Sequence, residues 1–182
     1  RATKRGDIFA HGVCHPFLWL SFWAPLFALG QVMTRLKLNW VGAQCSEEET
    51  QQIFSKLGTV VGGWFVSNVL VVYSFVYQLL NDTISPIEIF AFVMINLWMF
   101  AFSVFVTGNT RGQLRRVHKL SDTTESDYLL ALIYMPFTIA QMGRHTADYD
   151  RLEARLCTSS GLAPGIDVSY PTTNGTSYQR QG

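Results

Sequence analysis

The sequence predicts an all-α membrane protein: a two-span helical hairpin plus two short Pro-kinked helices that are interfacial or re-entrant. Of its 182 residues, 48% are hydrophobic and only 15% are charged, a balance skewed for a soluble domain. The charges are also unevenly placed, because residues 57–81 and residues 89–110 contain none. A helix needs about 20 apolar residues to cross a hydrocarbon core. We therefore assign the spans to about residues 57–80 and 86–107.

A proline inside an apolar run, followed five or six residues later by a glutamine, occurs twice in the chain. The copies are Pro25 with Gln31 in residues 15–34, and Pro136 with Gln141 in residues 128–143. Proline interrupts the hydrogen bonding of a helix, and a buried amide costs free energy away from water. We expect both stretches, called the Pro–Gln segments below, to be kinked helices rather than ordinary spans.

The placement of Lys and Arg predicts the topology. The turn at residues 81–86 contains neither residue type, so the positive-inside rule places it away from the cytosol. If the Pro–Gln segments do not cross the membrane, all 14 Lys and Arg fall on the opposite side from this turn. If both segments cross, half of these residues move to the side of the turn. The first arrangement fits the rule better and places both termini on the cytosol-equivalent side.

The chain is expected to contain a single membrane domain, residues 1–157, and a flexible polar tail, residues 158–182. The tail is rich in Gly, Ser, Thr, Pro and Asn, a composition that builds no core. The three cysteines, Cys14, Cys45 and Cys157, are odd in number and scattered. They therefore imply no disulfide framework.

Asn68, Gln78 and Asn96 are amides inside the predicted spans. Counted from the turn, Asn68 and Asn96 lie at similar depth, and amides in lipid hydrogen-bond to one another. These amides, with Ser67 and Ser74, could line a pore or hold the helices together. The uncharged runs contain none of the ionisable groups that usually mark an ion path. Helix packing is therefore the favoured interpretation.

A small-residue motif, Gly58-Thr-Val-Val-Gly62 followed by Gly63, lies in the first span. Small residues at this spacing let two membrane helices approach closely. The motif predicts helix packing and favours self-association of the chain in the bilayer.

Three short motifs, in matching order and at roughly matching spacing, resemble those of the placenta-specific-eight family over about residues 9–150. Ala24-Pro25-Leu-Phe-Ala-Leu-Gly30-Gln31 is similar to the family's Cys-Pro-Cys-x-x-x-Gly-Gln signature. Arg111-Gly-Gln-Leu114-Arg115 is similar to its Arg-x-x-Leu-Arg, and Phe137-Thr-Ile-Ala-Gln141-Met-Gly-Arg144 to its closing Cys-Ala-Leu-x-Gln-x-x-Arg. The family includes plant cadmium-resistance proteins and cell-number regulators.

The resemblance implies a homo-oligomeric protein of the plasma membrane that acts in cation homeostasis, signalling or cell-size control; an organelle membrane is the open alternative. The signature cysteines are replaced here by Ala24, Leu26 and Phe137. Thiolates are the soft ligands that would hold cadmium, zinc or copper. The metal-handling role of the cadmium-resistance members is therefore not carried over to this chain.

Other function classes find little in the sequence. His11, Cys14 and His15 are weak metal candidates, because their spacing matches no standard site. No cofactor is predicted, and the absence of a basic, aromatic-interleaved stripe argues against nucleic acid. Without a phosphate loop, nucleophile elbow or HExxH motif, a non-catalytic protein is expected. The alternative to the family role is a structural accessory subunit of a larger membrane complex, packing through Trp19, Trp23, Trp64 and Trp98.

Overall fold

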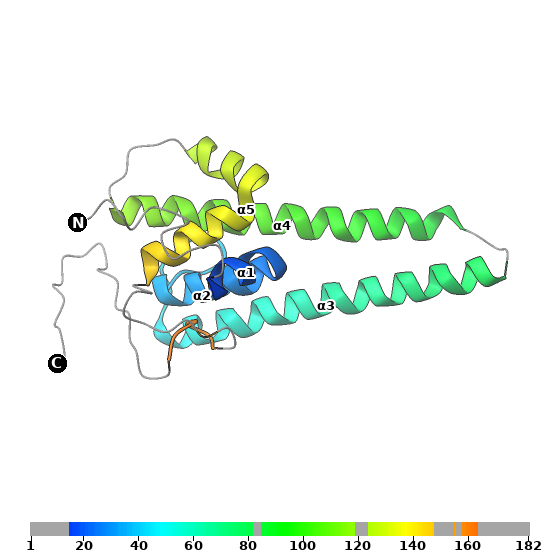
Figure 1. Cartoon of the computed structure of the whole chain (residues 1–182), viewed down its shortest axis with the longest axis horizontal. Helices are drawn as coiled ribbons and strands as arrows, with labels where there is room; N and C mark the ends of the chain where they lie inside the picture. Colours follow the sequence, from blue (N-terminus) through cyan, green and yellow to red (C-terminus); the bar gives the residue numbers. More distant parts are fainter. Residues whose placement is uncertain (1–14, 82–84, 119–123, 148–154, 156–157, 164–182) are drawn as a thin grey trace.

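The computed structural model describes residues 15–81, 85–118, 124–147, 155 and 158–163. Within these residues the regular elements are helices, and the only β-pairing is an isolated bridge between Leu38 and Gln44. The helices are α1 (Pro16–Trp23), α2 (Pro25–Leu36), α3 (Glu47–Leu80), α4 (Pro86–His118) and α5 (Thr124–Thr146). In Figure 1, α3 and α4 run antiparallel, while α1, α2 and α5 gather around one end of this pair. We call α1, α2, α5 and the adjoining ends of α3 and α4 the base.

The first Pro–Gln segment forms two helices instead of one kinked helix. His15 caps α1, accepting a hydrogen bond at Nδ1 from the Phe17 N–H at 3.2 Å. The chain then breaks at Ala24, where φ is −141° and ψ is 66°, and Pro25 occupies the first turn of α2. Proline is favoured there because its missing N–H would have had no partner within the helix. Pro25 therefore starts a helix, a correction to the predicted kink.

Both long helices extend beyond the predicted spans. α3 starts at Glu47 because Ser46 and Glu49 form a reciprocal capping box, so the ten residues before the span predicted from residue 57 are also helical. With 34 residues, α3 is about 51 Å long at 1.5 Å per residue. By length and composition, α3 and α4 could each cross a membrane. A hydrocarbon core is only about 30 Å thick, so α3 is longer than a single span requires.

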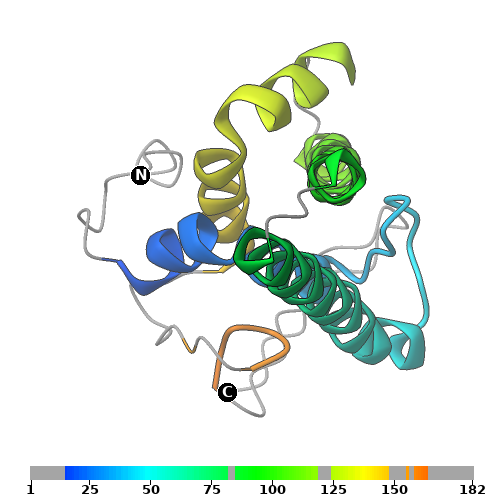
Figure 2. The same ribbon diagram turned by 90° about the vertical axis from the view of Figure 1, so that its right-hand side faces the viewer.

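The second Pro–Gln segment is kinked, as predicted, although its helix is longer than residues 128–143. The kink lies at Tyr134, where φ is −125° and ψ is 34°, two residues before Pro136. Thr138 bridges the kink by donating its hydroxyl hydrogen to the Leu130 carbonyl oxygen at 3.3 Å. The two halves of α5, residues 124–134 and 135–146, consequently point in different directions (Figure 2).

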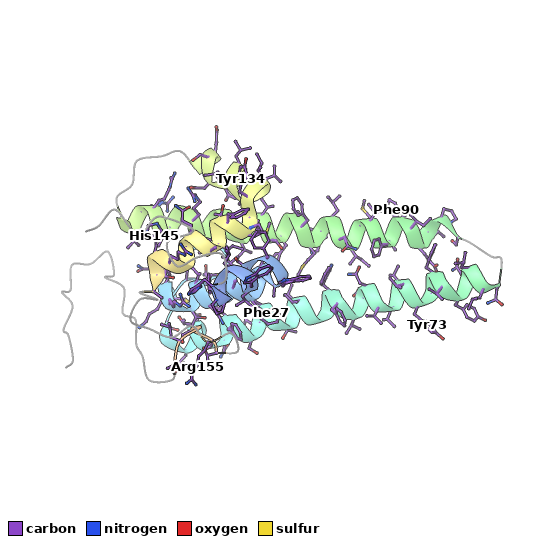
Figure 3. The ribbon with its side chains drawn as sticks, viewed as in Figure 1. Phe27, Tyr73, Phe90, Tyr134, His145 and Arg155 are labelled. Carbon is purple, nitrogen blue, oxygen red and sulfur yellow. The ribbon has the colours of Figure 1, made fainter. Side chains whose placement is uncertain are left out.

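The hydrophobic core lies in the base. Its buried members come from α2, α5 and the adjoining ends of the long helices and include Leu29, Met33, Leu57, Val106, Ile139 and Met142. Along the rest of α3 and α4, large apolar side chains are exposed. Tyr73 and Phe90, labelled in Figure 3, are 71% and 64% exposed.

Residues 158–163 pack against the base, which corrects the predicted start of the flexible tail at residue 158. Leu162 is completely buried, and Gly161, with φ at +68°, lies directly against Gln31 and Arg35. A positive φ favours glycine, and a Cβ at this position would overlap both side chains. Residues 164–182 of the predicted tail lie outside the described residues.

Two glycines in helices should respond in opposite ways to alanine. A Cβ at Gly143 would overlap the Phe17 ring, whereas a Cβ at Gly62 has no neighbour within 4 Å. We expect Gly143→Ala to lower the free energy of unfolding by about 1–3 kcal/mol through overpacking. Gly62→Ala should leave it unchanged or raise it by up to about 1 kcal/mol. Thermal unfolding of the detergent-solubilised protein measures both, and equal losses would contradict this packing.

Candidate functional site

A buried ion-pair cluster ties α5 to the end of α4. Asp127 is fully buried, and its two carboxylate oxygens lie 3.0 Å from Arg111 Nε and 3.2 Å from Arg115 Nη2. Arg111 also donates from Nη1 to Gln141 Oε1 at 3.3 Å. The two arginines are four residues apart and thus share one face of α4. A buried carboxylate needs such compensation, because charge is costly away from water.

This cluster joins two of the motifs found in the sequence, but its central member was missed. The sequence identified Arg111, Arg115 and Gln141, which the structure brings together around Asp127. Asp127 immediately precedes the uncharged run of the second Pro–Gln segment. The sequence signal that could have identified Asp127 was an acidic residue at the edge of an uncharged run, in a chain that also offers two arginines four residues apart.

A second polar cluster forms around Gln31 and Arg35 of α2. The Gln31 amide donates from Nε2 to the carbonyl oxygens of Thr158 at 3.0 Å and Arg155 at 3.4 Å. Arg35 donates from Nη1 to the Gly143 carbonyl oxygen and the Thr146 hydroxyl, both at 3.2 Å. Carbonyls in the last turn of a helix lack partners within the helix and carry partial negative charge. Arg35 therefore secures the C-terminal end of α5 and the segment that follows.

Arg35 also makes contacts outside the end of α5. It donates from Nε to the Ser160 carbonyl oxygen, and its guanidinium lies over the Phe17 ring, 5.5 Å from the centroid. In the sequence, Arg35 directly follows the first Pro–Gln segment. In the structure this one side chain joins α1, α2, α5 and the segment at residues 158–163.

The other residues of the three motifs have packing positions. Gly30 allows α2 to approach α3, because a Cβ there would lie 3.2 Å from Leu57 and 3.3 Å from Phe54. Leu114 and Arg144 are both buried in the base. Gly30, Leu114 and Arg144 thus pack inside the base, whereas Ala24 and Pro25 of the first motif line a groove at its surface.

Asn68 and Asn96 are paired between α3 and α4, which confirms the predicted matching depth. Asn96 Nδ2 donates to Asn68 Oδ1 at 2.8 Å. Asn68 Nδ2 in turn donates to the Trp64 carbonyl oxygen of its own helix at 2.9 Å. The pair joins the two long helices well beyond the base.

The second predicted span is not free of charged residues, because it contains Glu88. It lies in the first turn of α4, inside the span predicted for residues 86–107. Glu88 Oε1 accepts hydrogen bonds from Ser74 Oγ and Gln78 Nε2, and Gln78 Oε1 accepts from the Ser85 N–H at 2.8 Å. Sequence reasoning missed Glu88 because it counted only the uncharged run that begins one residue later.

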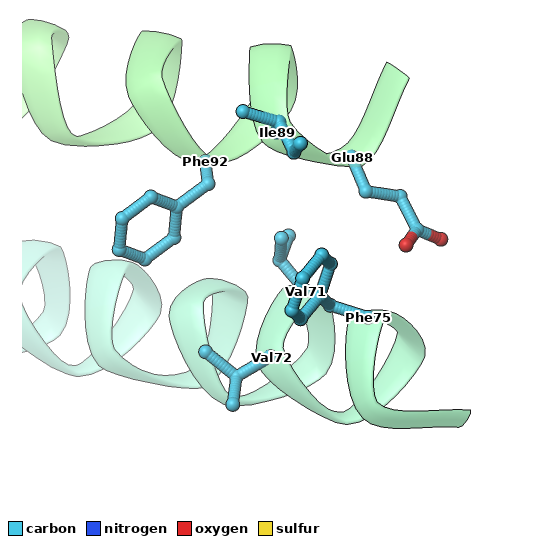
Figure 4. Close-up of a pocket in the computed structure, with 6 residues that line it drawn as sticks. All are labelled: Val71, Val72, Phe75, Glu88, Ile89 and Phe92. Atoms are coloured by element: carbon cyan, nitrogen blue, oxygen red, sulfur yellow. The ribbon is translucent and has the colours of Figure 1, made fainter. Parts of the chain in front are cut away.

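The Glu88 carboxylate stands at the edge of a small cavity between the two helices (Figure 4). The cavity has a volume of about 220 Å³, and its other lining residues are Val71, Val72, Phe75, Ile89 and Phe92. Glu88 Oε2 is buried and has no hydrogen-bond partner among the described residues. The hydrogen bonds to Glu88 thus come from α3, and they join the two helices at the end of the pair that is farther from the base.

The remaining candidates are the glycines of the small-residue motif and the three weak metal candidates. Gly58 has only Phe27 nearby, and Gly62 and Gly63 face open space, so these two glycines make no close helix contact within the chain. His15 is a helix cap, while His11 and Cys14 lie outside the described residues. In the described part of the chain, no three His, Cys, Asp or Glu side chains are grouped as a metal site would require.

The importance of the buried carboxylate can be measured directly. Asp127→Asn preserves the size of the side chain but leaves Arg111 and Arg115 beside a neutral partner. Removing one member of a buried ion pair typically costs about 3–5 kcal/mol, so we expect a large fall in the thermal unfolding midpoint. The control is Glu125→Gln, an exposed carboxylate two residues away. Equal midpoints for the two variants would show that the cluster does not hold α5 in place.

Comparisons with models of protein families, with curated proteins and with solved structures find no match to this chain.

Proposed function

We propose that this chain is a non-catalytic integral membrane protein whose helices α3 and α4 cross the bilayer as a hairpin. The observation that carries the proposal is the separation of surfaces. Large apolar side chains are exposed along α3 and α4, whereas the ion pairs Arg111–Asp127 and Arg115–Asp127 are collected in the base. In water, exposed apolar surface of this extent is unfavourable. In lipid, exposed apolar side chains are favourable, and the polar groups of a helix backbone are already hydrogen-bonded within the helix.

The base is proposed to lie at the cytosol-equivalent face, partly inserted in the interface. Trp19 and Trp23 of α1 are 51% and 83% exposed, as expected for aromatic side chains at headgroup level. The first half of α5 exposes Leu129, Leu132 and Ile133, which lie three and four residues apart on one helical face. Both segments thus expose apolar surface beside the base and its buried ion pairs, which supports a position at the membrane interface.

Self-association in the bilayer is the proposed mode of action, in cation homeostasis, signalling or cell-size control as the family resemblance implies. The amides of Asn68, Gln78 and Asn96 are engaged within the α3–α4 pair. This bonding supports a packing role for them in the single chain. The open face at Gly62 and Gly63 offers a position where a helix of another chain could approach closely.

The alternative role, a structural accessory subunit, is favoured by one observation. Trp98 lies 12 residues after the start of α4, well inside the proposed span, and is 76% exposed. Tryptophan prefers the two interfaces of a bilayer to its middle. An exposed indole at this depth would be better covered by a partner protein or a bound aromatic molecule.

Cysteine labelling tests the membrane topology. In a chain whose three natural cysteines are replaced by Ser, we introduce Asn81→Cys, Arg116→Cys or Arg5→Cys. An impermeant maleimide applied to intact cells should label the first, because it lies in the turn, and should reach the other two only after permeabilisation. Labelling at position 5 in intact cells would mean that the first Pro–Gln segment crosses the bilayer. Labelling at both 81 and 116 would overturn the hairpin.

Native mass spectrometry of the detergent-extracted protein separates the two roles. Apart from bound lipid, we expect masses equal to an integer number of copies of the 20.5 kDa chain, because this chain is the only polypeptide in the proposed assembly. Other polypeptides co-purifying in fixed ratio would instead identify an accessory subunit. A strictly monomeric species in several mild detergents would contradict self-association.

A further inference from the structure

An apolar groove opens where the break between α1 and α2 meets the long helices. Its volume is about 480 Å³, within the range of pockets that hold ligands. The apolar lining comes from all five helices and includes Trp23, Phe27, Val61, Trp64, Met99 and Met135. The small side chains of Ala24 and Ser103 are also part of the lining.

The lining offers nothing to a charged or strongly polar occupant. No Asp, Glu, Lys, Arg or His is among its residues, and its polar side chains are those of Asn96, Ser103 and Trp64. Asn96 donates to Asn68 Oδ1 and to the Phe92 carbonyl oxygen, while Ser103 donates to the Met99 carbonyl oxygen. Trp64 Nε1 is buried and has no hydrogen-bond partner among the described residues. Apart from this one N–H, the lining is apolar or bonded within the chain, so the groove matches a hydrocarbon.

The rim shows where that hydrocarbon would come from. Trp23 is 83% exposed and Phe100 is 46% exposed, so the groove is continuous with the outward apolar surface of α4. In the proposed membrane placement, on which this inference rests, the groove opens sideways into the acyl region of the bilayer. An unfilled groove would forfeit the dispersion contacts of its walls.

We propose that this groove binds one acyl chain of a membrane phospholipid, held in fixed ratio to the protein. Met99 and Met135 supply flexible, polarisable walls that adapt to a chain of variable shape. The aromatic rings of Trp23, Phe27 and Phe100 supply large contact areas. The bound chain completes the packing between the α1–α2 break and the middle of the hairpin.

Filling the groove from within tests the site. Val61→Phe places a ring in the groove, whereas the control Val66→Phe adds the same ring at an exposed position of the same helix. The full chain is reconstituted with palmitoyl-oleoyl-phosphatidylcholine, extracted in mild detergent and weighed by native mass spectrometry. We expect one retained lipid per chain in the wild type and the control, and a fall of about tenfold or more in lipid occupancy for Val61→Phe.

A second measurement does not fill the groove. Vesicles containing a phosphatidylcholine brominated on its acyl chain should quench Trp64 more strongly than Trp40, which lies in the connection between α2 and α3, outside the groove. Single-tryptophan chains, with the other tryptophans replaced by Phe, assign the signal. Weak quenching of Trp64, equal lipid retention by all chains, or a protein dimer lost only in Val61→Phe would each overturn the lipid site. If the labelling pattern for the hairpin holds at the same time, the proposed topology stands while the groove assignment falls.

Discussion

Arg111 and Arg115 bind Asp127 and so connect the long helix α4 with α5, the helix that folds back over its end. Besides these ion pairs, the first half of α5 contacts α4 through Tyr128, whose ring lies against Gly108 and whose hydroxyl donates to Asn109 Oδ1 at 2.6 Å. Because Arg111 also reaches Gln141, the same cluster fixes both sides of the kink in α5. The second half of α5 is thereby placed where α1 and α2 can pack against it.

The two prolines give the chain the reversals that this packing requires. Pro25 ends one short helix and starts another, so that Arg35 at the far end of α2 reaches the C-terminal carbonyls of α5. Pro136 follows a break that turns the second half of α5 along the base. At the first break the Ala24 N–H completes the last helical bond of α1, to the Leu20 carbonyl oxygen, and at the second the Thr138 hydroxyl donates to the Leu130 carbonyl oxygen. The breaks are therefore stabilised as part of the fold.

Features carried by a local pattern could be predicted, and features that depend on a distant partner could not. The uncharged runs identified α3 and α4, and counting from the turn paired Asn68 with Asn96. The ends of α3 and α4 were missed because Glu, Gln and Arg continue a helix as readily as they form a loop. Asp127 gains its role only from arginines on another helix, and Leu162 is a single apolar residue in a polar stretch. Neither residue belongs to a periodic sequence pattern that would predict its burial.

The positions of the polar groups between α3 and α4 limit how the proposed hairpin could act alone. Asn68 bonds with Asn96 near the middle of the pair, and Glu88 bonds with Ser74 and Gln78 at its far end. Between these two levels lies a cavity walled largely by Val71, Val72 and Phe75. A polar path through one chain would be interrupted by this apolar section, where a desolvated ion is costly. Any movement of ions would therefore require a path formed between copies of the chain, which makes self-association the condition for the cation-linked role.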